Sequence, residues 1–251
     1  MRCPELTDLS PLAGLSQLAE LYLGATQVSD LSPLARLARL TRLRLMTCPG
    51  VSDLSPLSSL SQLGELSLDR CGQLADLSPL AGLTRLEALS LDRCELVRDL
   101  SPLIGLGLLE ELHLYGCDQV TDLSPLAGST RLRVLSLSNC RHVSDAGPLA
   151  GLVALRDLHL TGCLRMSDLG PLAGLAGLRT LHLSECPELS DLSPLAGLTQ
   201  LVELDLTDCR QVRDLAPLVG LAELRELCLI GCYEVIEPDS LAGRSELTIV
   251  R

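Results

Sequence analysis

The sequence predicts an α/β solenoid, in which one short unit repeats to give a parallel β-sheet on one side and short helical turns on the other. Leucine supplies 66 of the 251 residues, whereas Phe and Trp are absent. A core built from one aliphatic residue type indicates one packing solution used many times. Nine cysteines between Cys48 and Cys232 recur every 23 residues, and ten aspartates between Asp8 and Asp214 recur every 22 or 23.

The first half of each unit predicts a short strand with one buried face. The segment Leu89-Ser90-Leu91 alternates apolar and polar residues, which is the period of a half-buried strand. Cys94 follows, and a small thiol at this point packs as a hydrophobe and donates weakly to a turn carbonyl. We expect reduced, buried thiols, because parallel side chains on successive coils do not meet the geometry of a disulfide. Cys3 falls in the same phase, and Cys228 lies outside this column.

The second half of each unit predicts a tight helical turn. In Asp99-Leu-Ser101-Pro102-Leu103, we expect Ser101 at the cap position and Pro102 as the first helical residue. The aspartate is expected to accept hydrogen bonds from N–H groups of the turn. The following Pro-Leu-Ala-Gly-Leu segment is too short for more than a 3₁₀-helix or a single α-turn.

The repeated pattern is Leu-x-x-Leu-x-Leu-x-x-Cys-x-x-Val/Leu, followed by Asp-Leu-Ser-Pro-Leu-x-x-Leu. It resembles leucine-rich repeats of the short bacterial internalin-like class, with Cys in place of the usual Asn. The match covers residues 1–251 as a single domain of about 10.5 units of 22–23 residues. The resemblance implies a concave parallel sheet, with short 3₁₀ or helical turns on the convex side.

The ends of the array lead to a second expectation. The chain begins at the cysteine of one unit and stops at Val250-Arg251, inside the strand of an eleventh unit, without polar capping segments. We therefore expect a fragment or region of a larger protein, present as a monomer or in weak end-to-end association. The array also resembles repeat regions of bacterial NACHT-type signalling ATPases, so a ligand-sensing or autoinhibitory region of such an ATPase is the alternative function.

The charge balance is mainly architectural. The net charge is -12, but ten of the 32 acidic residues form the aspartate column, and the other 22 nearly balance 20 arginines. Lysine is absent and no basic stripe alternates with aromatic residues, which excludes nucleic acid as the expected partner. No apolar run has membrane-span length, and the start Met1-Arg2-Cys3-Pro4-Glu5 is unlike a signal peptide. We expect a cytoplasmic protein without membrane contact.

The sequence contains no convincing catalytic constellation. It has no Gly-rich phosphate loop and no Ser-His-Asp arrangement that stands out, so we expect neither an enzyme nor a cofactor. His159, His182 and Asp205 fall on three successive strands, where they would suit a transition metal or a pH-sensitive contact. The alternative is a set of solvated residues on a variable face. We favour the alternative and expect no metal, because adjacent parallel strands fan outward instead of enclosing an ion.

The predicted function is a non-enzymatic module that binds a macromolecule, most simply a protein, on its concave face. Residues between the fixed leucines vary from unit to unit, and aromatic and arginine side chains among them suit the role of anchors. The stretch from His113 to Asp205 is predicted as the main contact, because it is chemically more varied than the Ser67 and Ser90 region. The predicted partner-binding residues are Tyr22, Arg42, Arg44, His113, Tyr115, Arg156, His159, Arg179, His182, Glu203 and Asp205.

Overall fold

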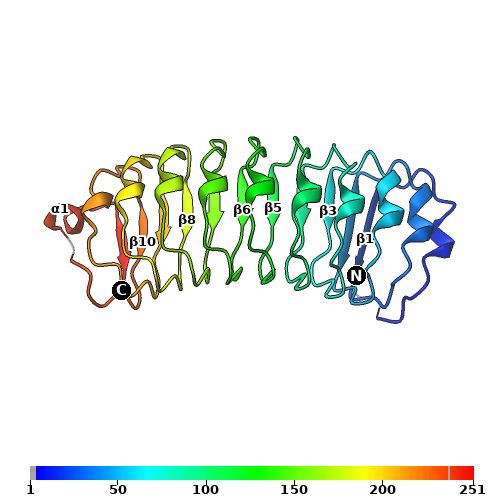
Figure 1. Ribbon diagram of the computed structural model, residues 1–251, viewed down its shortest axis with the longest axis horizontal. Helices are drawn as coiled ribbons and strands as arrows, with labels where there is room; N and C mark the ends of the chain where they lie inside the picture. Colours follow the sequence, from blue (N-terminus) through cyan, green and yellow to red (C-terminus); the bar gives the residue numbers. More distant parts are fainter. Residues whose placement is uncertain (1–3, 237) are drawn as a thin grey trace.

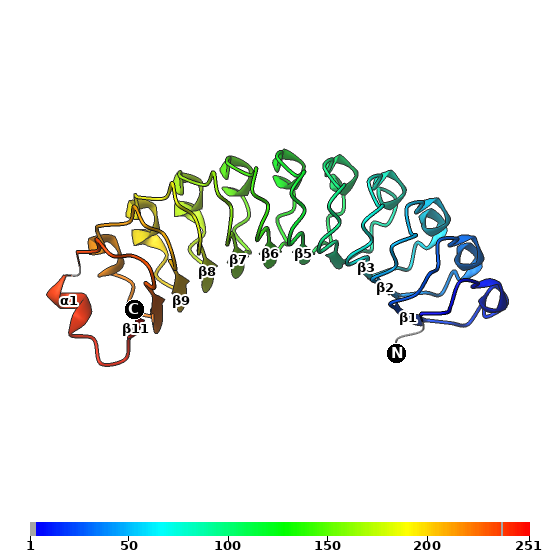
Figure 2. The same cartoon turned by 90° about the horizontal axis from the view of Figure 1, so that it is seen from below.

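In the computed structural model, which describes residues 4–236 and 238–251, eleven parallel strands form one sheet in chain order (Figure 1). The sheet lines the inner side of a curved solenoid, and each strand is hydrogen-bonded to the strands of the units before and after it (Figure 2). The strands are β1 (Glu20–Gly24), β2 (Arg42–Met46), β3 (Glu65–Ser67), β4 (Ala88–Ser90), β5 (Glu111–His113), β6 (Val134–Ser136), β7 (Asp157–His159), β8 (Thr180–His182), β9 (Glu203–Asp205), β10 (Glu226–Cys228) and β11 (Thr248–Val250).

Short 3₁₀-helices lie on the outer side of the arc, as the repeat pattern predicts (Figure 2). They are η1 (Ser10–Leu12), η2 (Ser32–Arg36), η3 (Ser55–Ser59), η4 (Ser78–Leu80), η5 (Ser101–Leu103), η6 (Ser124–Leu126), η7 (Gly147–Leu149), η8 (Gly170–Gly174), η9 (Ser193–Gly197) and η10 (Ala216–Leu218). The last unit departs from the pattern with a four-residue α-helix, α1 (Asp239–Ala242). Glu237, which the repeat also includes, lies outside the described residues.

The core consists of leucine columns that run through the whole array. The central leucines of successive strands pair directly, for example Leu66 with Leu89 and Leu89 with Leu112. These side chains are at most 1 % exposed. Because each leucine contacts its equivalents in the adjacent coils, truncating an internal one to alanine is expected to cost about 2–5 kcal/mol.

The start of each helical turn differs in one detail from the sequence prediction. The 3₁₀-helix η5 begins at Ser101 itself, so Ser101 is not the cap and Pro102 is the second helical residue. The N–H acceptor is instead Asp99, whose Oδ1 lies 2.8 Å from the Ser101 nitrogen, while Ser101 Oγ donates to Oδ2 over 3.0 Å. A carboxylate two residues earlier in the chain reaches this N–H directly, which confirms the capping role predicted for the aspartate column.

The cysteine column is buried as expected from Cys48 to Cys209, whereas Cys232 is partly exposed. From Cys71 onward, each thiol of the column donates to the carbonyl of the second strand leucine in the preceding coil, for example Cys117 Sγ to Leu91 O over 3.1 Å. The ten described cysteines are free, and Cys3 lies outside the described residues. In the unit without a cysteine, Thr26 takes the position and its Oγ1 lies 3.2 Å from Cys48 Sγ.

A column of left-handed residues sits immediately before the cysteines and turns the chain into the coil. Seven non-glycine residues there have φ between 52° and 61°, and the glycines of the column reach 77°. Arg93, for example, has φ 58° and donates its N–H to Tyr115 O over 2.6 Å. The column comprises Ala25, Thr47, Arg70, Arg93, Gly116, Asn139, Gly162, Glu185, Asp208 and Gly231. Every coil thus needs a conformation that only glycine adopts without strain.

Candidate concave binding face

The concave face presents the side chains that alternate with the buried leucines. In β5, the central Leu112 is buried, whereas Glu111 is exposed and His113 is partly exposed. The same alternation holds in β7 to β9, whose outer residues are partly exposed. Because the register is the same at every step, equivalent residues of successive units lie side by side on the sheet. The predicted residues in strands, such as Tyr22 and Asp205, therefore belong to one continuous surface.

At the N-terminal end of this face, Tyr22, Arg42 and Arg44 form an ion-pair network with two glutamates. Arg42 Nη1 lies 3.0 Å from Glu20 Oε1, and its Nε lies 3.4 Å from Glu65 Oε2. Arg44 binds the same Glu65, and its guanidinium covers the Tyr22 ring at 5.4 Å from the centroid. Tyr22 donates its hydroxyl to Glu20 over 2.7 Å, which raises the pKa of Tyr22. These arginines are already matched by carboxylates.

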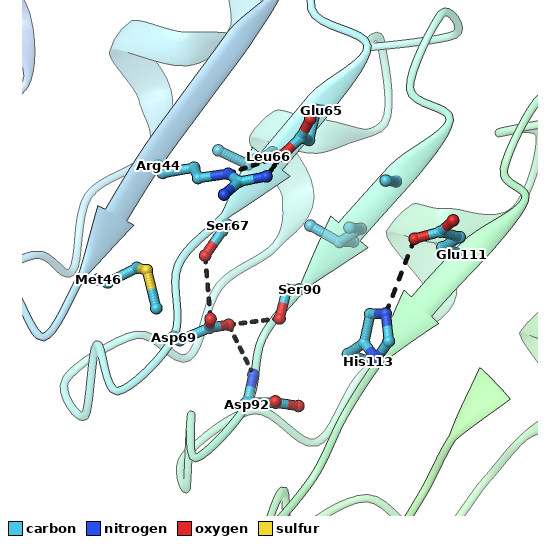
Figure 3. A pocket seen from close by; sticks show the side chains of 12 residues that line it. Arg44, Met46, Glu65, Leu66, Ser67, Asp69, Ser90, Asp92, Glu111 and His113 are labelled. Carbon is cyan, nitrogen blue, oxygen red and sulfur yellow. Dashed lines mark hydrogen bonds and ion pairs between the residues drawn. The ribbon is translucent and has the colours of Figure 1, made fainter. Parts of the chain in front are cut away.

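A shallow hollow of about 450 Å³ lies next to this network, over β3 to β5 (Figure 3). Its floor contains the small side chains Ser67, Ala88 and Ser90, which leave room where other units carry arginine or histidine. Arg44 and Met46 line it on the side of β2, and Glu111 and His113 line it on the side of β5. The hollow therefore has room for a side chain.

Two carboxylates, Asp69 and Asp92, lie at the end of the hollow where the strands finish (Figure 3). Asp69 accepts hydrogen bonds from the hydroxyls of Ser67, over 3.1 Å, and of Ser90, and from the N–H of Asp92, over 3.3 Å. Asp92 accepts the Tyr115 N–H over 2.8 Å. Partial burial raises the pKa of Asp92, and the nearby charge of Asp69 acts in the same direction.

Farther along the face, the predicted histidine cluster is a hydrogen-bonded chain. His159 Nδ1 lies 3.0 Å from His182 Nδ1, and His182 Nε2 lies 2.8 Å from Glu203 Oε1. The two rings meet edge to face at 4.6 Å between centroids. Burial lowers the pKa of His159, and the charge of His182 lowers it further. Glu203, and not Asp205, is thus the third member of this hydrogen-bonded chain.

Asp205 has a different role from the one considered in the sequence. Its Oδ1 accepts the Thr207 N–H over 2.9 Å, and hydrogen bonds from Ser184 and Thr207 outweigh partial burial and lower its pKa.

Within the described residues, no group of three or more His, Cys, Asp or Glu side chains is placed to hold a metal ion. In the same part of the chain, no helix combines the length and the apolar character of a membrane span.

Arg156 and Arg179 precede the first residues of β7 and β8, at the edge of the sheet where the strands begin. Arg156 Nη1 donates to the Gly177 carbonyl over 2.6 Å. At the opposite edge, Arg93 lies over the Tyr115 ring at 5.2 Å from its centroid. The predicted residues therefore divide among the ion-pair network, the hollow, the histidine chain and the two edges.

Sequence reasoning missed the hollow, because it searched for large and charged side chains. The sequence does contain a signal for the hollow. Three small residues, Ser67, Ala88 and Ser90, occupy outward-facing positions of two adjacent strands. His113 and Arg44 are the two predicted residues that line the hollow.

Comparison with known proteins supports the repeat assignment. Residues 176–220 match the family model for leucine rich repeats in two copies. Internalin InlF from Listeria monocytogenes is similar over 98% of this chain and 84% of its own, with 26% identity and a TM-score of 0.65. Internalin C2 from the same organism is 33% identical over 80% of this chain and 76% of its own, with a TM-score of 0.55. A comparison with curated protein sequences gave no match.

A third structure shares the fold. The functional domain of InlJ from Listeria monocytogenes, which includes a cysteine ladder, covers 97% of this chain and 60% of its own, with 20% identity and a TM-score of 0.64. The predicted similarity to repeat regions of NACHT-type ATPases is not among these matches and stays a prediction. The repeat pattern, the eleven described strands and the match to internalin C2 establish that the chain belongs to the leucine-rich repeat family, in its internalin-like class.

Proposed function

We propose that the protein is a non-enzymatic interaction module that binds a protein partner on the concave face of its sheet. Internalin-like leucine-rich repeat folds are generally scaffolds for protein interaction. The observation that carries the proposal is the hollow over β3 to β5, a preformed depression of about 450 Å³ in the concave sheet. A rigid surface of this kind binds with little ordering cost, and a pocket within it accepts one anchoring side chain.

The proposal extends the predicted contact region toward the N-terminus. The stretch from His113 to Asp205 contributes the histidine chain and Tyr115, while the hollow adds Ser67, Ser90 and Asp69. A partner that covered both would contact strands β3 to β9. Such a span is consistent with an interface of ordinary size.

The experiment fills the hollow and compares the result with a matched surface change. Ser90→Tyr places a large ring in the hollow and replaces no buried leucine, whereas Ser58→Tyr makes the same change in η3 on the convex side. Each variant, immobilised, is used to capture partners from the source cell, and captured proteins are quantified by mass spectrometry. We expect Ser90→Tyr to lose partners that the unmodified protein and Ser58→Tyr retain.

A second pair of variants tests the aromatic contact. Tyr115→Ala removes a concave side chain and Tyr233→Ala removes one that is 86% exposed in the last unit. If Tyr115 is an anchor, its loss weakens binding of a captured partner by more than about 1 kcal/mol, with little effect from Tyr233→Ala. Loss of partners with Ser58→Tyr or Tyr233→Ala, and not with the concave variants, would assign the working surface elsewhere.

A further inference from the structure

A row of five charged residues follows the edge of the sheet at which the strands begin. Each precedes one strand from β4 to β8, in the order Glu87, Glu110, Arg133, Arg156 and Arg179. The backbone N–H of each residue after the first donates to the carbonyl of the residue before it, over 2.7–2.8 Å. Neighbouring residues are therefore one strand spacing apart, about 4.8 Å. The edge thus carries two acids followed by three arginines.

Arg133 is the last arginine of this row that forms an ion pair with a carboxylate. Glu110 lies 2.6 Å from Arg131 Nη2 and 3.5 Å from Arg133 Nε, so its carboxylate is shared by two guanidinium groups. In the described part of the chain, neither Arg156 nor Arg179 forms an ion pair with a carboxylate. Val202, which is 38% exposed, takes the next place in the row. An uncompensated positive segment therefore lies on a protein of net charge -12.

The guanidinium of Arg156 is held in place by the backbone of the next unit. Its Nη1 donates to the Gly177 carbonyl over 2.6 Å, and a Cβ at Gly177 would lie only 2.0 Å from that nitrogen. The absence of a side chain at Gly177 is what makes room for this position. A guanidinium has five N–H donors, so the group stays able to bind an anion while one donor is used in this way.

We propose that Arg133, Arg156 and Arg179, with Val202 at their end, form a docking strip for an acidic segment of a protein partner. Guanidinium groups bind carboxylates through paired, charge-assisted hydrogen bonds, and a bound anion removes the repulsion between adjacent arginines. In an extended segment, residues three apart are about 10 Å from each other, which matches the two strand spacings between Arg133 and Arg179. Val202 offers an apolar contact beyond the carboxylates.

The same features disfavour a nucleic acid. A strand with a phosphate at every nucleotide would continue past the strip over Glu110 and Glu87, and no aromatic residue stands in the row to stack on a base. The strip lies at the edge of the sheet, outside the concave hollow. It is therefore a second surface. If the docking strip proved not to bind acidic peptides, the proposal that a partner binds at the concave hollow would still stand.

The strip is tested by fluorescence anisotropy with a labelled peptide of the composition Gly-Glu-Asp-Leu-Glu-Asp-Glu-Gly. Its counterpart, with Gln and Asn in place of the acids, serves as the uncharged probe. We expect the acidic peptide alone to bind, with an affinity that falls as salt rises. The double variant Arg156→Gln/Arg179→Gln should raise Kd about tenfold or more, since each carboxylate loses a charge-assisted partner.

Two further variants test whether peptide binding depends on the strip itself or only on the net charge of the protein. Arg36→Gln/Arg39→Gln removes the same net charge from exposed arginines elsewhere and should leave Kd within about twofold. Gly177→Ala keeps the charge but displaces the Arg156 guanidinium, so it should raise Kd by a smaller factor. Circular dichroism checks that each variant is folded, and Ser90→Tyr, which blocks the hollow, should bind the peptide normally.

Three results would overturn the proposal. The first is equal binding of the acidic peptide by Arg156→Gln/Arg179→Gln and the unmodified protein. The second is an equal loss of binding in Arg36→Gln/Arg39→Gln, which would mean a diffuse charge effect. The third is tighter binding of a dT oligonucleotide with the same dependence on Arg156 and Arg179, which would assign the strip to nucleic acid.

Discussion

His159 and His182 face each other through their Nδ1 atoms at 3.0 Å, so one imidazole donates and the other accepts. Glu203 Oε1 lies 2.8 Å from His182 Nε2, and a carboxylate there favours a hydrogen on that nitrogen. His182 Nδ1 is then the acceptor, and His159 Nδ1 is the donor. His159 Nε2 then carries no hydrogen and is the atom that takes up a further proton.

The surroundings of His159 predict a neutral imidazole at pH 7. Burial and the charge of His182 lower the pKa of His159 from its ordinary 6.5. An NMR titration of the imidazole signals should give His159 a midpoint below that value, and His182→Gln should move the midpoint upward because one of the two causes is removed. A midpoint above 6.5 in the unmodified protein would contradict these effects of burial and of the His182 charge.

The lowered pKa of His159 also determines whether acid raises or lowers the free energy of unfolding. In the unfolded chain, His159 binds its proton more readily than in the folded protein, so protonation favours unfolding. Its contribution is present above pH 6.5 and is lost as the pH falls through the lower folded pKa. Urea denaturation at several pH values should therefore show a smaller acid-dependent loss of stability in His159→Gln. An unchanged pH dependence would mean that His159 is not the group responsible.

The aspartate column predicts a second acid-sensitive transition at lower pH. Hydrogen bonds from the N–H and hydroxyl of Ser124 lower the pKa of Asp122, and the corresponding serines do the same for Asp53, Asp99 and Asp191. These carboxylates stabilise the fold above their unfolded pKa of about 3.9, and the contribution is lost as the pH falls through the lower folded values. Thermal melting of Asp122→Asn should show a lower Tm at pH 7 and a smaller difference near pH 2.

Much of the fold follows from the repeat because each coil places the same residue type in the same environment. Leucine spacing predicts the strands, and the position of Leu66 against Leu89 follows from a constant unit length. The exchange of roles between Ser101 and Asp99 could not be read from spacing, since both residue types cap turns. Only the backbone geometry decides which side chain reaches the N–H.

The binding surface was predicted less completely for a different reason. Residue columns state which side chains are neighbours, but they do not state which ones bind each other. Arg42 and Arg44 count as free anchors in the sequence, whereas in the structure Glu20 and Glu65 already bind them. Arg156 owes its position to Gly177, and the effect of a missing Cβ appears only when the adjacent coil is in place.

The left-handed column predicts opposite effects for two substitutions. Thr47 is β-branched and has φ 58°, so Thr47→Gly should raise the free energy of unfolding by about 1 kcal/mol, the relief of strain less the greater flexibility of unfolded glycine. Gly162, with φ 70°, has Asn139 Oδ1 2.6 Å from where a Cβ would lie. Gly162→Ala should therefore destabilise the protein by about 1–2 kcal/mol.

Gly128→Ala is the matched control for this pair. A Cβ at Gly128 would meet nothing within 4 Å, and its φ is outside the left-handed region. Urea denaturation should give a change within about 0.5 kcal/mol. Equal destabilisation by Gly128→Ala and Gly162→Ala would show that φ at the column is not the determining factor.

The cysteine column predicts a sharp division in thiol reactivity. Burial raises the pKa of Cys71, Cys163, Cys186 and Cys209 to about 12, so almost no thiolate forms there at neutral pH. Cys228 is partly exposed and lies outside the column. Alkylation of the native protein, followed residue by residue with mass spectrometry, should modify Cys228 first among the described cysteines. The buried thiols should react only at the rate at which the solenoid opens.

A substitution within the column measures what each thiol contributes. Cys117 Sγ donates to Leu91 O over 3.1 Å, and the Cys94 N–H donates to the same carbonyl over 3.0 Å, so Cys117→Ala removes one of two donors and opens a small cavity. The expected cost is about 1–3 kcal/mol in urea denaturation. Cys117→Ser keeps a donor of similar size, but its shorter bond to Cβ places the hydroxyl farther from Leu91 O, so we expect an intermediate loss. Cys228→Ala, at a partly exposed position, should change stability less than either. If Cys117→Ala proved neutral while the native thiols reacted freely, the column would be a solvent-accessible row instead of part of the core.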